Sequence, residues 1–155
     1  MKDADEQTFF NYRFIELKHG RVAQLAVLGH ITQYFVRLPG YIDFDGHKFS
    51  DYPSGFAALA SIPTLGLLQI LGSIAYWELK GWKQVEGSTP GDFGIPYLSS
   101  IKTEADKAKA RAQELNNGRA AMMGIFAIIV HELPSGHPYI INDVLGLTYK
   151  WNEGF

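Results

Sequence analysis

One six-residue phrase occurs twice in this chain, and it constrains the fold more than any other feature. Residues 16–21 read Glu-Leu-Lys-His-Gly-Arg, and residues 114–119 read Glu-Leu-Asn-Asn-Gly-Arg. Each copy places a carboxylate, a neutral nitrogen or oxygen donor and a guanidinium in the same order, and each leads into small and apolar residues. The repeat predicts two similar hydrophobic helices that begin with the same polar side chains.

The spacing within the phrase predicts ion pairs between the two helices. Glu16 and Arg21 would lie roughly 140° apart around a helix, so Arg21 points away from its own glutamate. An ion pair within one helix uses a spacing of three or four residues instead. We therefore expect Arg21 to pair with Glu114 and Arg119 to pair with Glu16, reciprocally about a two-fold axis.

Small residues in both copies would let the two backbones approach closely. They are Gly20, Ala23, Ala26, Gly118, Ala120 and Ala121. The alternative is a pair of amphipathic core helices with ordinary acidic residues near their N-termini. That alternative does not explain why glutamate, donor, glycine and arginine recur in the same order.

Length and composition exclude several classes of protein. A chain of 155 residues is expected to form one domain, residues 1–155. The net charge of −2 and the lack of a basic stripe argue against nucleic acid as a partner. The chain has no cysteine, which excludes disulfides and thiolate metal sites. No nucleophile–base arrangement stands out, so we do not expect an enzyme. The polar, acidic N-terminus lacks a signal or transit pattern.

Three apolar stretches, at about residues 14–38, 62–79 and 113–133, are close to the roughly 20 residues that span a bilayer. Ionisable and amide side chains interrupt each stretch, and inside a membrane such residues mark functional sites. Residues 103–117 are expected to form an exposed helical lead-in to the third stretch. These features predict an all-α membrane protein with three transmembrane helices.

Charge and direction set the expected topology of these helices. The connection after the second stretch is the more basic one, which places it on the same side as the N-terminus. The first and third helices would then run in parallel and cross, related by a pseudo-two-fold axis along the membrane normal. Residues 138–146 are expected to form a short amphipathic helix at the interface. A simple structural cap is the alternative for that segment.

Two kinds of metal chemistry could use the repeated side chains. Glu16 and His19 form the Glu-x-x-His pair of di-iron bundles. Asn117 in the second copy is a poor iron ligand, however, and no fourth long helix is available. A macrocycle whose magnesium needs one axial ligand, such as chlorophyll, accepts imidazole, carboxylate or amide donors. Pairing with arginine would remove the cost of a lone carboxylate ligand in an apolar environment.

Several phrases together resemble a known family. They are residues 5–17, 16–23, 49–55, 90–92, 114–123, 130–132 and 138–142. The chain resembles the three-helix light-harvesting chlorophyll-binding antenna proteins, and most of all the chlorophyll a/c antennae of red-lineage algae. These are the fucoxanthin- or peridinin-containing proteins, and two phrases look most like the dinoflagellate branch. The resemblance covers nearly the whole chain.

The resemblance implies a set of chlorophyll ligands. The side chains that match family ligand positions are Glu16, His19, Gln69, Glu78, Glu114, Asn117 and His131, with Arg21 and Arg119 as ion-pair partners. Glu78 follows Gln69 by nine residues rather than the eight of the green-plant pattern. Gln24 also departs from the family, because methionine is commoner there.

His30 is a further candidate ligand. It follows His19 by eleven residues, within about 20° of the same helix face. The alternative is a histidine that is hydrogen-bonded near the end of the helix.

The resemblance also implies a function. An antenna of this kind binds chlorophyll a, chlorophyll c and carotenoids of the peridinin or fucoxanthin type and the diadinoxanthin type. It passes excitation energy to a photosystem core beside neighbouring antenna subunits and thylakoid lipids. Its place would be the plastid thylakoid membrane, with several passes and a stromal N-terminus. A photoprotective quencher on the same scaffold and an unpigmented membrane scaffold are the alternatives.

Overall fold

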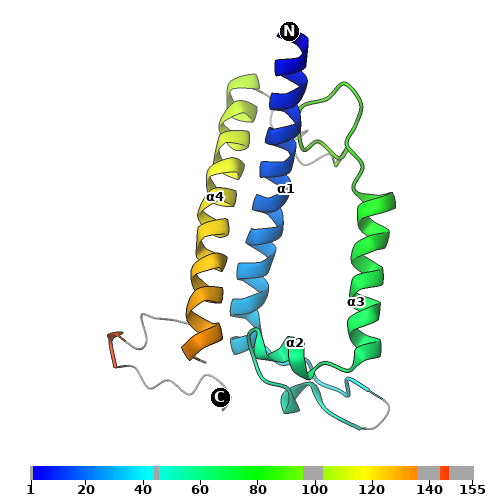
Figure 1. The fold of residues 1–155 in the computed structure, drawn as a ribbon, viewed down its shortest axis with the longest axis vertical. Helices are drawn as coiled ribbons and strands as arrows, with labels where there is room; N and C mark the ends of the chain where they lie inside the picture. Colours follow the sequence, from blue (N-terminus) through cyan, green and yellow to red (C-terminus); the bar gives the residue numbers. More distant parts are fainter. Residues whose placement is uncertain (1, 44–45, 96–102, 136–143, 147–155) are drawn as a thin grey trace. The chain divides into compact units, whose positions relative to one another are not determined.

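The computed structural model describes residues 2–43, 46–95, 103–135 and 144–146, and within them the chain is helical (Figure 1). A single isolated antiparallel bridge joins Tyr41 to Lys48. The elements are α1 (Lys2–Phe35), a 3-10 turn η1 (Phe49–Asp51), α2 (Ala57–Ser61), α3 (Thr64–Tyr76), a π-helical turn η2 (Trp77–Gly81) and α4 (Glu104–Ser135). The all-α class is confirmed.

The helix boundaries extend two of the three predicted stretches. α1 begins at Lys2, well before residue 14, because the polar residues that precede the apolar stretch include good helix formers such as Glu6 and Gln7. α4 begins at Glu104, so the expected helical lead-in is confirmed and is continuous with the apolar part. α3 is shorter than predicted, and the π turn η2 follows it directly.

Among the described residues, none of the helices is both long enough and apolar enough to cross a membrane. The helix predicted over residues 138–146 falls mainly outside the described part of the chain, which includes only 144–146 of that segment.

Contacts divide the chain into two compact units. Unit 1 consists of Met1–Leu25 and Ile74–Met123, and unit 2 consists of Ala26–Ser73 and Gly124–Phe155. Both α1 and α4 contribute residues to each unit. The fold is therefore best described one unit at a time.

In unit 1, the first part of α1 and the first part of α4 run side by side in the same direction (Figure 1). Their backbones come closest at two glycines. A Cβ atom added to Gly20 would lie 2.9 Å from the Cα of Gly118, and one added to Gly118 would lie 2.9 Å from the Cα of Gly20. Ala23, one turn further along α1, is buried. The expected close approach of small residues is confirmed at these positions, whereas Ala26 and Ala120 are exposed.

In unit 2, the end of α1 holds the loop that precedes α2. The side-chain oxygen Oε1 of Gln33 accepts the backbone N–H of Gly55 at 3.0 Å. The buried hydroxyl of Ser54 accepts a hydrogen bond from Arg37 and donates one to the carbonyl of Gln33 at 3.4 Å. Gly55 has φ +76°, a conformation that glycine adopts without steric cost. The polar end of α1 thus fixes the turn at residues 54–55.

The described helices bury few apolar side chains against one another. Within the described residues, Ala23 is the only buried hydrophobic residue, and no large side chain is fully buried. Large apolar residues on α1, α3 and α4, such as Leu25, Leu68 and Phe126, are exposed. So many large exposed apolar side chains are consistent with helices that contact another apolar phase or partner.

The glycine contact generates a prediction. Changing Gly20 to alanine forces the two backbones apart, and overpacking of this kind costs about 1–3 kcal/mol. Gly29 on the same helix is the matched control, because a Cβ added there meets nothing within 4 Å. Thermal unfolding in detergent, followed by far-ultraviolet circular dichroism, should show a lower Tm for Gly20→Ala and an unchanged or higher Tm for Gly29→Ala. Equal Tm values for both variants would contradict the close approach.

Candidate functional site

Two reciprocal ion pairs join α1 and α4 on either side of the glycine contact. Arg21 Nε donates to Glu114 Oε1 at 2.7 Å, and Arg119 Nε donates to Glu16 Oε1 at 2.6 Å. The pairing predicted from the spacing of the repeat is confirmed. Each arginine therefore offsets the charge of the glutamate on the opposite helix.

The two ion pairs differ in their surroundings. The side chains of Arg21 and Glu114 are 25% and 23% exposed, whereas Arg119 is 54% exposed beside a 28% exposed Glu16. Glu16 also accepts a hydrogen bond at 2.9 Å from Arg13, three residues earlier on the same helix. Arg13 was not predicted as a partner from the sequence, although it lies three residues before Glu16, a spacing at which ion pairs form within a helix. The Arg21–Glu114 pair is thus the less exposed of the two.

Arg21 also fixes the loop that contains the Pro-Gly-Asp phrase. Its Nη1 donates to the carbonyl of Gly91 at 2.7 Å, and its guanidinium lies 5.0 Å from the ring centroid of Phe93. Phe93 packs edge-on against Phe14 of α1, with centroids 6.3 Å apart. Gly91 is buried with φ +82°, and a Cβ there would lie 3.0 Å from Leu17. Only glycine fits this position without strain.

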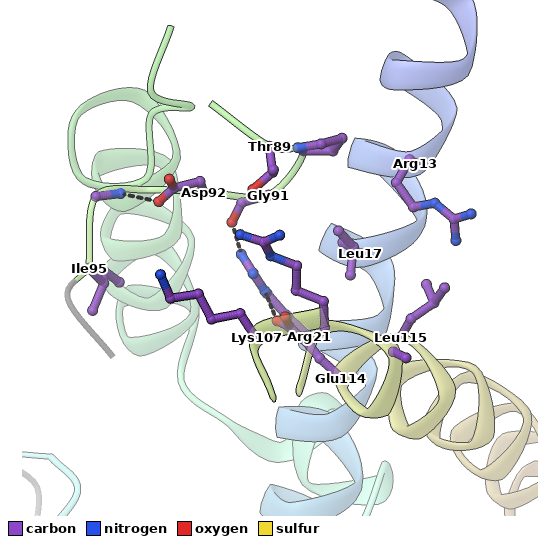
Figure 2. Close-up of a pocket in the computed structure, with 14 residues that line it drawn as sticks. Arg13, Leu17, Arg21, Thr89, Gly91, Asp92, Ile95, Lys107, Glu114 and Leu115 are labelled. Atoms are coloured by element: carbon purple, nitrogen blue, oxygen red, sulfur yellow. Dashed lines mark hydrogen bonds and ion pairs between the residues drawn. The ribbon is translucent and has the colours of Figure 1, made fainter. Parts of the chain in front are cut away.

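Beside this ion pair lies a cavity of about 590 Å³ (Figure 2). It is lined by α1, α4 and the loop at residues 89–95, and Figure 2 shows Arg21 and Glu114 joined within it. Basic and apolar side chains share the lining: Arg13, Arg21, Lys107 and Arg111, with Leu17, Ile95 and Leu115. Ligand pockets typically combine apolar lining residues with a few polar groups that orient the ligand.

His19 is arranged as a metal ligand would be. Its Nδ1 lies 2.8 Å from the carbonyl oxygen of Ile15, one turn earlier. Because a carbonyl only accepts, Nδ1 carries the proton and the lone pair is on Nε2. The ring is exposed, and no described residue hydrogen-bonds Nε2. In metal sites, a hydrogen bond from the ring nitrogen that does not bind the metal orients the histidine ligand.

The amide side chains predicted as ligands are accessible. Asn117, the counterpart of His19 in the second copy, is exposed beside the buried Gly118. Gln69 is exposed on α3.

Glu78 lies in the π turn that follows α3, and it pairs with Lys18 of α1. The turn is closed by a hydrogen bond of 2.8 Å from Trp82 N to Trp77 O. The rings of the same two tryptophans stack with centroids 6.1 Å apart. Sequence reasoning did not identify Lys18, because nothing local connects two residues separated by sixty positions.

His30 is placed differently from His19. It is 5% exposed, and its Nε2 lies 2.7 Å from Oε2 of Glu132, which is 7% exposed. The other carboxylate oxygen of Glu132 accepts the backbone N–H of Phe56 at 2.7 Å. The rings of His30 and Phe56 lie 5.5 Å apart. This geometry favours the hydrogen-bonded alternative for His30, because Nε2 is directed at a carboxylate.

Glu132 is a residue that the sequence analysis did not single out as functional. It joins α4 to α1 and to the residue that precedes α2 within unit 2. Its neighbour His131 is partly exposed. The sequence feature that could have indicated this role is a glutamate within the third apolar stretch. A buried carboxylate needs hydrogen-bond or ionic partners.

A di-metal centre finds no support in the described part of the chain. There, no three His, Cys, Asp or Glu side chains come together as a group that could hold a metal ion. The carboxylates of the repeat pair with arginines instead.

Comparison with known proteins identifies the family. The family model described as Chlorophyll A-B binding protein matches residues 1–133. The chain is 49% identical over 158 residues to fucoxanthin-chlorophyll a-c binding protein D, chloroplastic, of Macrocystis pyrifera, covering 98% of this chain and 87% of that protein. It is 51% identical to protein E of the same alga, covering 97% of this chain and 74% of that protein.

A diatom relative is similar over a shorter range. Fucoxanthin-chlorophyll a-c binding protein F, chloroplastic, of Phaeodactylum tricornutum is 45% identical over 135 residues, covering 84% of this chain and 68% of that protein. The resemblance to the chlorophyll a/c antenna proteins of the fucoxanthin type is therefore confirmed, whereas the likeness of two phrases to the dinoflagellate branch stays a prediction. This chain belongs to the chlorophyll A-B binding protein family, among the fucoxanthin-chlorophyll a-c binding proteins.

Proposed function

We propose that the chain is a light-harvesting antenna protein that binds chlorophyll a, chlorophyll c and fucoxanthin and passes excitation energy to a photosystem. The observation that carries this proposal is the pair of arginine-bound glutamates, each followed one turn later by a potential ligand, His19 or Asn117. The names of the relatives supply the pigments. The protein is not an enzyme: the pigments supply the photochemistry, and the chain sets their spacing and orientation.

The residues present fit chlorophyll. Magnesium accepts carboxylate, amide or imidazole donors. Arg119 and Arg21 offset the charges of Glu16 and Glu114, and Arg13 also contacts Glu16. Each glutamate could therefore serve as a magnesium ligand without the cost of an uncompensated carboxylate. His19 offers Nε2 to a second pigment beside Glu16.

The remaining ligand assignments complete the proposal. Asn117 serves through its amide oxygen at the position equivalent to His19. Gln69, Glu78 and His131 serve as ligands away from the repeat. His30 instead holds Glu132 and joins the helix ends, because its Nε2 is already engaged.

Bound pigments and lipids would cover the apolar faces of the helices. We place α1, α3 with η2, and α4 in the thylakoid membrane of the plastid, with the N-terminus on the stromal side. α1 and α4 are then related by a pseudo-two-fold axis along the membrane normal. A carotenoid of the diadinoxanthin type is a further pigment in this proposal, and the partners are a photosystem core and neighbouring antenna subunits.

Reconstitution with pigments tests the function directly. The chain, refolded in detergent with chlorophyll a, chlorophyll c and fucoxanthin, should show chlorophyll a emission after excitation of either of the other two pigments. A nanosecond fluorescence lifetime would support an antenna. A strongly shortened lifetime would support the photoprotective alternative, and an absorption spectrum without bound chlorophyll would refute both.

The exposed His19 and the buried His30 give a matched pair of predictions. His19→Ala should lose one chlorophyll per protein with little change in Tm, because the ion pairs of the repeat remain. His30→Ala should keep the chlorophyll count and lower Tm, since breaking a buried pair from one side costs about 3–5 kcal/mol. Pigment analysis and thermal unfolding of both reconstituted variants measure this. A pigment lost from His30→Ala at unchanged Tm would make His30 a ligand instead.

A further inference from the structure

Three charged residues of α1 reach three different partners within unit 1. Glu16 pairs with Arg119 and Arg21 pairs with Glu114, the last and first residues of the repeated phrase on α4. Lys18, which lies between them, pairs with Glu78 in the π turn η2. Lys18 is also a position at which the two copies of the phrase differ, since the second copy has Asn116 there. The repeat therefore does not account for Lys18.

Glu78 has no suitable counter-ion on its own helix. The positions three and four residues after it are Gly81 and Trp82, and those before it are Ala75 and Ile74. These are the spacings at which ion pairs form within an α-helix. The structure pairs Glu78 with Lys18 of α1 instead.

The geometry of the pair leaves one carboxylate oxygen available. Lys18 Nζ donates to Oε2 of Glu78, and no described residue bonds Oε1. A lysine ammonium acts as a compact point charge, whereas an arginine can engage both oxygens of a carboxylate. The side chains of Lys18 and Glu78 are 38% and 29% exposed, so the pair is open to a ligand from outside.

The π turn adds a second feature to this place in the fold. Such turns are rare and are frequent at functional sites. The rings of Trp77 and Trp82, from the first residue of this turn and the residue that follows it, stack on one another and are both exposed. Exposed aromatic rings of this kind can pack against a macrocycle.

We propose that Lys18 is the positioning residue that makes Glu78 a chlorophyll ligand, by neutralising its charge and directing Oε1 outward. This inference rests on the proposed function, in which Glu78 binds magnesium. Lys18 then does for the pigment at η2 what the two arginines do for the pigments of the repeat. A single charged residue of α1 thus determines whether the π turn holds a pigment.

Four variants reconstituted with the same pigments test the proposal, with chlorophyll per protein and Tm as readouts. Glu78→Leu should lose one chlorophyll. Lys18→Met should lose the same one. The double variant Lys18→Met, Glu78→Gln should regain the chlorophyll, because a neutral amide oxygen needs no counter-ion. Lys83→Met is the control for removal of a lysine close to Glu78 in the sequence, and it should keep the full count.

The outcomes separate this inference from the function on which it rests. A full chlorophyll count in Glu78→Leu would overturn the ligand role of Glu78 and the role of Lys18 with it. Loss in Glu78→Leu but not in Lys18→Met would overturn only the role of Lys18. Loss of the chlorophyll in both Lys18→Met and the double variant would show that Lys18 acts by holding η2 against α1. That result would overturn the neutralising role.

Discussion

The contact between α1 and α4 depends on opposite charges placed around two glycines. Gly20 and Gly118 bring the backbones together, and the arginine that follows each glycine reaches the glutamate of the other helix. The close approach and the pairing require each other. Without the glycines the arginines would not reach, and without the arginines each glutamate would lose its partner on the other helix.

The same interaction connects the fold to pigment binding. In the part of the chain that the structure describes, the helices bury almost no large apolar side chain, so their outer faces need apolar material around them. Chlorophyll and carotenoid supply it in the proposed function, and the paired glutamates give chlorophyll neutral ligands. Arg21 adds the loop at residues 89–95 through Gly91 and Phe93, so one side chain links two helices, the loop and the wall of the cavity.

The sequence predicted the parts of the site that follow from local spacing. The repeat fixed the partners of Arg21 and Arg119, because neither arginine could reach its own glutamate. The partner of Glu78 and the burial of Glu132 could not be predicted in this way, since both depend on which distant segments pack together. Ala26 and Ala120 are small residues outside the contact, and composition alone does not distinguish them from Gly20 and Ala23. The ligand roles of the individual residues stay predictions.

Exchanging the charges of one pair tests the account most directly. In Arg21→Glu and in Glu114→Arg, two like charges face each other, whereas the double variant restores an ion pair of reversed direction. Reconstitution with pigments, followed by thermal unfolding, measures the three variants beside the unaltered chain. The account predicts that each single variant fails to reconstitute or loses much of its thermal stability, and that the double variant recovers most of it. Single variants that reconstitute normally, or a double variant no better than either, would contradict the reciprocal pairing as the basis of this fold.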